Sequence, residues 1–406
     1  MVRKAIQLAP NIQHVRLQFC RPLTRALRAR QSQLGSSNSR TDHVSFPESS
    51  AQKAALLTFC AQSGVNFEWR TWTEAIDASR LRSLNLGRVR KIEYFDPLID
   101  SITLPSLEKL ALRLEMAWDH DAQRKVKTFM GGLRPLNTLR LHGMMDSSLV
   151  DSIIERHGSA LRNLLMDPYC FNSDARPWSL TATIIGQLSV KCPRLRELGL
   201  TVPRFKGNHD EITCYQALGS FHFLEKLCLN LDCSISEPGF FGREQWSAFD
   251  LMEYSSITTS AIQICNGDIR DILINAAVDK DLVRSIWENI LSYQKRPTSL
   301  RWMMISPRRS GYISSVRPAG IGHKVEHMSR SFELTKTGKT AIDVIEIGQA
   351  RRERQDSEWR EIEEQALREM GQRIDSDLED IMRTIWPFRE GIDDWRLFWS
   401  SFPLSQ

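Results

Sequence analysis

A three-position hydrophobic pattern recurs along the chain and predicts its elements. In LEKLAL, Leu107, Leu110 and Leu112 stand at positions i, i+3 and i+5. The last two positions lie two residues apart, so they share one face of a short strand. Each copy is therefore expected to form one strand with a buried face.

The pattern is a repeat. The first positions of six copies are 26, 29, 25, 34 and 29 residues apart, and four of these steps fit the spacing of leucine-rich repeats. Weaker copies are Ile12-Val15-Leu17, Leu300-Met303-Ile305 and Ile269-Ile272-Ile274. The clear copies begin at Leu81, Leu107, Leu136, Leu161, Leu195 and Leu224.

Helical spacing of apolar residues between the copies, at 147–160, 180–192 and 281–294, predicts helices there. Strand–helix repeats predict an α/β leucine-rich-repeat solenoid. The asparagine or cysteine that closes the consensus is missing, so we expect an irregular solenoid. In five copies that position holds Val89, Glu115, Met144, Pro203 and Asp232.

Three domains are predicted. Residues 1–50 form a basic segment with a degenerate repeat and a flexible loop, residues 51–310 the solenoid, and residues 311–406 a helical, Trp-rich extension. The extension is expected to hold a hairpin around KTGK, a charged helix over 350–385 and an aromatic cap. The helix stripe comprises Ile362, Ala366, Met370, Ile374, Leu378 and Ile381; the cap comprises Trp386, Phe388, Trp395, Phe398, Trp399 and Phe402.

The chain of 406 residues has a mild net charge of +5 and eight cysteines, none in a CxxC pair. Scattered cysteines in a long chain indicate reduced, mostly buried thiols and a cytoplasmic or nuclear protein. Residues 1–41 hold eight Lys or Arg and no acidic residue. That composition leaves a mitochondrial presequence as an alternative.

One motif carries candidate catalytic chemistry. HKVEH at 323–327 would place His323 and His327 on one helix face to bind zinc, with Glu326 as general base. Nearby Pro318, Gly320 and Gly322 argue against a helix, so we expect exposed histidines in an extended segment. We therefore predict no enzyme and no cofactor, with a zinc hydrolase as the alternative.

A second alternative is nucleic-acid binding. The arginine-rich stretch Arg16–Arg30 could contact phosphates, although the basic residues are confined to that one segment. A broad basic stripe would be the stronger signal.

Strand residues between the core leucines should face the concave side of a solenoid, which is where such proteins bind partners. The sequence thus predicts a non-enzymatic scaffold for protein–protein interaction, with no membrane partner. The candidate binding residues are Arg82, Ser83, Asn85, Glu108, Lys109, Arg113, Asn137, Thr138, Arg140, Arg196, Glu197, Glu225 and Lys226.

Several phrases give a family resemblance. CPRLREL, LPSLEKLAL, LRPLNTLRLHG, DKDLVRSIWENIL and DWRLFWSSFPLS resemble the leucine-rich-repeat proteins of filamentous fungi, many of which carry an F-box. The resemblance implies a substrate-recognition subunit of a cullin ubiquitin ligase, with the Skp adaptor and cullin as partners through the F-box. No F-box match is visible in the opening MVRKAIQLAPNIQHVRL, so the resemblance transfers no adaptor-binding residue.

Overall fold

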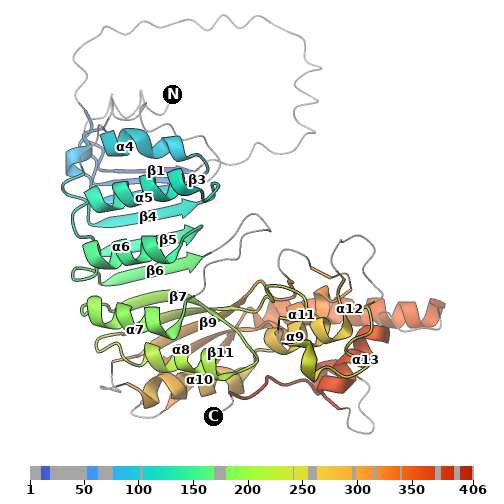
Figure 1. Ribbon diagram of the computed structural model, residues 1–406. Helices are drawn as coiled ribbons and strands as arrows, with labels where there is room; N and C mark the ends of the chain where they lie inside the picture. The colour runs from blue at the N-terminus through green and yellow to red at the C-terminus, as the bar shows by residue number, and fades with distance from the viewer. Residues whose placement is uncertain are drawn as a thin grey trace, which may run out of the picture. The chain divides into compact units, whose positions relative to one another are not determined.

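The computed structural model describes residues 11–18, 53–62, 76–100, 104–168, 180–240, 242–254, 263–294, 299–313, 317–318, 320–338, 341–370, 376–387 and 394–404. Helices and strands alternate along much of this part of the chain, which confirms the expected α/β class (Figure 1). The chain divides into two compact units. The first comprises Met1–Met144 and Ser148–His157, and the second Met145–Ser147 and Gly158–Gln406. The domain boundaries at residues 50 and 310 stay predictions.

The described residues of the first unit form five strands that pair in chain order as a parallel, open sheet. They are β1 (His14–Gln18), β2 (Thr58–Gln62), β3 (Ser83–Val89), β4 (Lys109–Leu114) and β5 (Thr138–Gly143). The connections hold η1 (Ala78–Arg80), η2 (Ile92–Phe95), α4 (Asp96–Asp100), α5 (His120–Gly132) and α6 (Ser147–His157). Their helices lie along one side of the sheet (Figure 1).

The repeated leucines form the core of the first unit. Leu84 lies beside Leu110, and Leu110 beside Leu139, in adjacent strands. All three are at most 1% exposed. Burying a leucine side chain contributes about 2 kcal/mol, so a stack of identical positions holds the strands in register. The prediction that the i+3 position lies on the buried face of a strand is confirmed for these three leucines.

The second unit begins with four parallel strands in chain order, followed by an antiparallel hairpin. The strands are β6 (Asn163–Pro168), β7 (Glu197–Pro203), β8 (Lys226–Asp232), β9 (Trp302–Arg308), β10 (Ser331–Lys336) and β11 (Ile342–Ile347). The hairpin predicted around KTGK is confirmed, with Lys336 opposite Ile342.

The helical elements of the second unit include α7 and α10 where the sequence predicts helices. They are α7 (Ala182–Lys191), α8 (His209–Leu218), η3 (Arg243–Gln245), α9 (Asn266–Ala276), α10 (Lys280–Ser292), α11 (Gly322–Met328), α12 (Gln349–Met370), α13 (Ser376–Ile385) and η4 (Trp395–Leu397).

One prediction about this unit is wrong. Ile269-Ile272-Ile274 is not a strand but part of α9, because a capping box starts a helix there, with Asp268 accepting a hydrogen bond from the backbone N–H of Cys265. The described residues of the predicted charged stretch 350–385 are helical, in α12 and α13, and residues 371–375 lie outside the described residues. Ile362 of the expected apolar stripe is 46% exposed. Ile374 lies outside the described residues.

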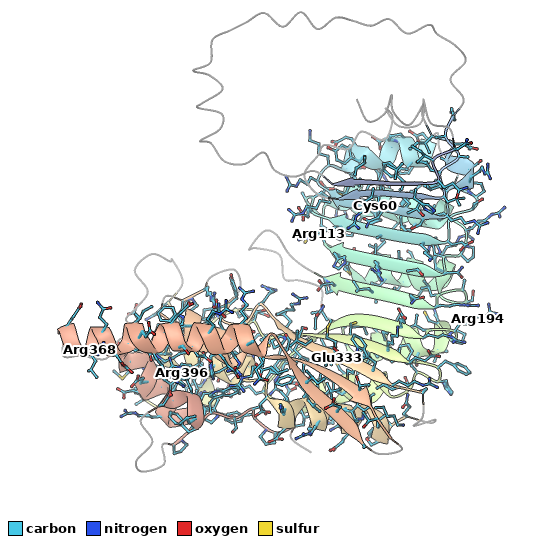
Figure 2. The ribbon with its side chains drawn as sticks, turned by 180° about the vertical axis from the view of Figure 1, so that it is seen from behind. Cys60, Arg113, Arg194, Glu333, Arg368 and Arg396 are labelled. Carbon is cyan, nitrogen blue, oxygen red and sulfur yellow. The ribbon has the colours of Figure 1, made fainter. Side chains whose placement is uncertain are left out.

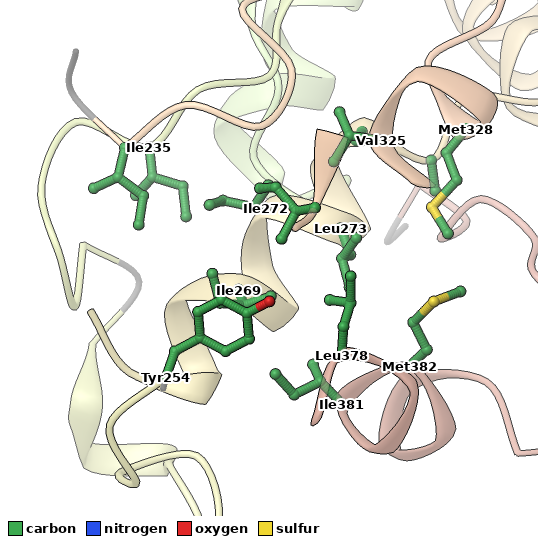
Figure 3. Packing of buried hydrophobic residues seen from close by; sticks show 14 of the residues in the cluster. Ile235, Tyr254, Ile269, Ile272, Leu273, Val325, Met328, Leu378, Ile381 and Met382 are labelled. Carbon is green, nitrogen blue, oxygen red and sulfur yellow. The ribbon is translucent and has the colours of Figure 1, made fainter. Parts of the chain in front are cut away.

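The C-terminal aromatics belong to a second hydrophobic cluster, which α9, α11 and α13 build together (Figure 3). Ile272, Val325 and Leu378 lie at its centre, at most 1% exposed. Trp386 and Trp395 are members of the cluster, and the partly buried Phe398, Trp399 and Phe402 pack against it. The predicted cap therefore covers helices of the second unit. Phe388 lies outside the described residues.

Helix α5 offers a local stability test. Its N-cap, Asp119, accepts a hydrogen bond from the backbone N–H of Ala122 at 2.8 Å. Asp119→Ala should lower the free energy of unfolding by about 1 kcal/mol, because that N–H loses its partner. Urea denaturation measures the loss. Asp151→Ala, at an exposed position of α6, is the control and should change stability by less than about 0.5 kcal/mol. Equal losses would contradict the capping role.

Candidate functional site

The side of the first unit's sheet opposite its described helices is the first candidate site, and we call it the first face (Figure 2). Alternate strand residues point to it, since their neighbours are the buried leucines. The strand pairing lines these residues up in rows. Ser83 aligns with Lys109 and Thr138, while Asn85 aligns with Ala111 and Arg140.

The first face is basic. Among the described residues, it carries seven Lys or Arg residues and two glutamates along the strands and at their ends. The basic residues are Arg16, Arg82, Arg88, Arg90, Lys109, Arg113 and Arg140, and the acidic residues are Glu108 and Glu115.

Glu115 organises three of the arginines at the ends of β3 and β4. Its carboxylate is 2.7 Å from Nε of Arg113, 3.1 Å from Nε of Arg88 and 3.4 Å from Nε of Arg90. The Glu115 side chain is 5% exposed, so it is a fixed anchor for the guanidinium groups. Three guanidinium groups therefore gather around one buried carboxylate.

The thirteen predicted binding residues fall into two groups. Nine of them, from Arg82 to Arg140, lie on the first face or at the strand ends that border it. The other four belong to the second unit, where they form two ion pairs. Lys226 Nζ lies 3.0 Å from Glu197, and Arg196 Nη1 lies 3.2 Å from Glu225.

The corresponding side of the second unit's sheet, the second face, has a different chemistry. Its central row runs from Leu165 through Gly199, Cys228 and Met304 to Glu333 and Ile345. Most of this row is apolar, and Ile345 is 56% exposed. Glu333, labelled in Figure 2, accepts a hydrogen bond from Trp302 Nε1 at 2.7 Å. Besides the ion pairs of the preceding paragraph, Arg309 lies 3.5 Å from Asp232.

Several residues of these faces escaped the sequence analysis. Arg16 lies in a weak copy of the repeat. Arg88 reaches the face because the pairing of β3 with β4 shifts register between Asn85 and Arg88. Glu115 occupies the consensus position where asparagine or cysteine is expected. An acidic residue at that position could have indicated that basic side chains gather around it.

The HKVEH segment is helical, contrary to prediction. It forms α11, and the side chains of His323 and His327 are 6% and 5% exposed rather than solvated. Gly322 opens the helix, and packing of Val325 and Met328 into the hydrophobic cluster stabilises it. Tertiary packing thus outweighs the low helix propensity of the nearby glycine and proline residues.

Both histidines face carboxylates of α12. His323 Nε2 lies 3.3 Å from Glu363, and His327 Nδ1 lies 2.7 Å from Asp356. His327 Nε2 is 3.0 Å from Arg330 Nη2. A guanidinium can only donate hydrogen bonds, so Nε2 of His327 accepts one from Arg330. Nδ1 therefore carries the ring's proton and donates a hydrogen bond to Asp356. His327 is therefore a neutral link between an arginine and an aspartate.

Burial and charge set the ionisation of this network. Burial lowers the pKa of His327 to about 4, against smaller opposing contributions from Asp356. Burial raises the pKa of Glu363, but hydrogen bonding with His323 and the charge of Arg396 together lower it to about 2. Glu363 is thus ionised at neutral pH.

The zinc interpretation gains no support from this arrangement. Among the described residues, no group of three or more His, Cys, Asp or Glu could hold a metal ion. Glu326, the proposed general base, is exposed and lies 3.3 Å from Arg317. The second nitrogen of His327 faces a guanidinium, which would repel a bound cation.

The described cysteines behave as the sequence predicts. All six are free thiols, and four are buried. Burial raises the pKa of Cys192 and Cys214 to about 11 and that of Cys233 to about 12, so these thiols stay protonated at neutral pH. Cys20 and Cys170 lie outside the described residues.

Comparison with known proteins adds no family. No protein-family model matches the chain, and no curated protein matches it significantly in sequence. In the part of the chain that the structure describes, no helix has the length and apolarity needed to cross a membrane. Of the arginine-rich stretch at 16–30, only residues 16–18 are described.

Proposed function

We propose that this chain is a leucine-rich-repeat scaffold that binds a partner protein on the exposed faces of its sheets. One observation carries the proposal. In both units helices line one side of the sheet, while the other side presents side chains in register (Figure 2). These side chains are largely basic or polar on the first face, and on the second face ion pairs flank an apolar central row. Strands about 4.8 Å apart hold these groups at fixed spacing, which suits a binding surface.

A narrower proposal follows from the resemblance to fungal F-box proteins. We propose that a form of the protein bearing an F-box acts as a substrate receptor of a cullin ubiquitin ligase. The F-box would bind the Skp adaptor, and the two faces would select the protein to be ubiquitylated. The support is the sequence phrases named above, several of which form the strands of the two sheets.

The scaffold proposal predicts that partners depend on the faces. Lys109→Glu, Arg140→Glu and Glu197→Lys together should reduce co-purification of direct partners by about tenfold or more, because reversed charges repel the complementary surface. The measurement is quantitative affinity purification of the tagged full chain, followed by binding with the purified partner.

The matched control carries Lys127→Glu, Arg134→Glu and Glu155→Lys, which give the same net charge change but lie on α5, its following loop and α6. It should keep its partners. If every partner also survives reversal of the face charges, the scaffold proposal is wrong. If partners depend on the faces but the longest natural form never captures the Skp adaptor, only the receptor proposal fails.

A further inference from the structure

We infer that the first face binds an extended, acidic segment of a partner protein. The inference rests on the proposed function and adds the chemistry of the partner. It concerns the first unit alone, where the described residues of the first face include more basic than acidic side chains.

The positive charge is particular to this face. On the helix side of the same unit, Lys125 lies 2.7 Å from Asp96, and Arg124 pairs with Asp121. Among the described residues of the first face, seven are basic and two are acidic, and three of the seven lie around Glu115. A surface with this excess attracts carboxylates and suppresses binding of basic partners.

The register row through the middle of the face fits an extended chain. It runs across five strands from Arg16 through Cys60, Asn85 and Ala111 to Arg140. Arginines stand at both ends, and the three residues between them are small. Four strand spacings amount to about 19 Å, the length of about six extended residues.

A peptide backbone could therefore lie over the small side chains while its carboxylates reach the terminal arginines. Arg113 and Arg88 form the next row, so acidic side chains that point to that side meet the Glu115 cluster. Arginine pairs well with carboxylates because its planar guanidinium can make two parallel hydrogen bonds.

The face suits a protein segment better than a nucleic acid. Within the described residues, no Phe, Tyr or Trp occupies an outward position of β1–β5. Single-stranded nucleic acids commonly bind by stacking their bases on such aromatics.

The test is fluorescence anisotropy with the full chain and a labelled peptide of about eight residues, rich in Asp and Glu. The probe should bind with strong salt dependence, because the charges involved are exposed. Its Asn/Gln counterpart should bind at least about tenfold more weakly.

Lys109→Glu with Arg140→Glu should raise the Kd for the acidic peptide about tenfold or more. Lys127→Glu with Arg134→Glu, which changes net charge equally, should leave the Kd nearly unchanged. Circular dichroism would check that both variants fold.

Three results would overturn the inference. They are equal binding of the neutral peptide, equal weakening by the control pair, and tight binding of an oligonucleotide without binding of the acidic peptide. In the last case the face is a nucleic-acid site. Failure of the acidic peptide to bind, while captured partners still need the face residues, would also overturn the inference but would leave the scaffold proposal standing.

Discussion

Replacing Glu211 with alanine should lower the free energy of unfolding by about 3–5 kcal/mol. Glu211 lies in the first turn of α8, and its Oε1 lies 2.6 Å from Nη1 of Arg204, with both side chains fully buried. The same carboxylate accepts hydrogen bonds from the Tyr215 hydroxyl and from the backbone N–H groups of Phe205 and Gly207. Without it, Arg204 keeps a buried charge that has lost its anion.

The measurement is equilibrium unfolding in urea, followed by tryptophan fluorescence. Glu225→Ala is the control, because its pair with Arg196 is exposed and should contribute less than about 1 kcal/mol. Glu211→Gln, which keeps one carbonyl acceptor, should fall between the two. If Glu211→Ala costs no more than the control, the buried network does not stabilise the second unit.

This network shows the limit of what the sequence could predict. Glu211 occupies the first turn of a helix, where an acidic residue normally faces solvent and interacts with the helix dipole. Its partner, Arg204, follows strand β7, and no local pattern marks either residue as buried. Their pairing depends on how the chain turns between β7 and α8, so only the three-dimensional structure reveals it.

The strands, in contrast, could be predicted because a local pattern marks them. Side-chain direction alternates along a strand, so the spacing of Leu110 and Leu112 alone decides which face is buried. The same rule places Lys109, Arg113 and Arg140 on the first face. It fails for Arg88, because a register shift before that residue changes the alternation. It also fails for Ile269 and Ile272, since residues three apart share a helix face as well.

Helix α11 and the arginine cluster at Glu115 depend on contacts between distant segments. The helix is supported by the hydrophobic cluster and by two carboxylates of α12, Asp356 beside His327 and Glu363 beside His323. Glu115 follows β4, and two of its arginines belong to β3 or directly follow it. The sequence shows that these segments contain charged residues, but it does not show which of them form ion pairs.

Acidification from pH 6.5 to about 4 should destabilise both units, because each contains a buried neutral histidine. Burial lowers the pKa of His157 in the first unit to about 4, and that of His327 in the second unit likewise. In the unfolded chain a histidine binds a proton near pH 6.5. Between these values the unfolded state binds more protons, so stability is full above pH 6.5 and falls as the pH decreases.

The magnitude follows from the shift. Each histidine should cost at most about 3 kcal/mol by pH 4, with a slope of up to about 1.4 kcal/mol per pH unit. Glu363 acts at lower pH. Its stabilising contribution is present above its ordinary pKa of 4.5 and is lost as the pH falls towards about 2. The window above pH 4.5 therefore reports mainly on the histidines.

The experiment compares unfolding free energies at several pH values between 7 and 4.5 for the wild type and single glutamine variants. His157→Gln and His327→Gln should each flatten the pH dependence by about one proton, whatever their effect on stability at neutral pH. His209→Gln, at an exposed position of α8, should leave the slope unchanged.

If both His157→Gln and His327→Gln keep the pH slope of the wild type, neither histidine resists protonation in the folded state. His327 would then not be a neutral link between Arg330 and Asp356. A change in one variant alone would assign the acid sensitivity to that histidine and its unit, because each lies in the core of a different one.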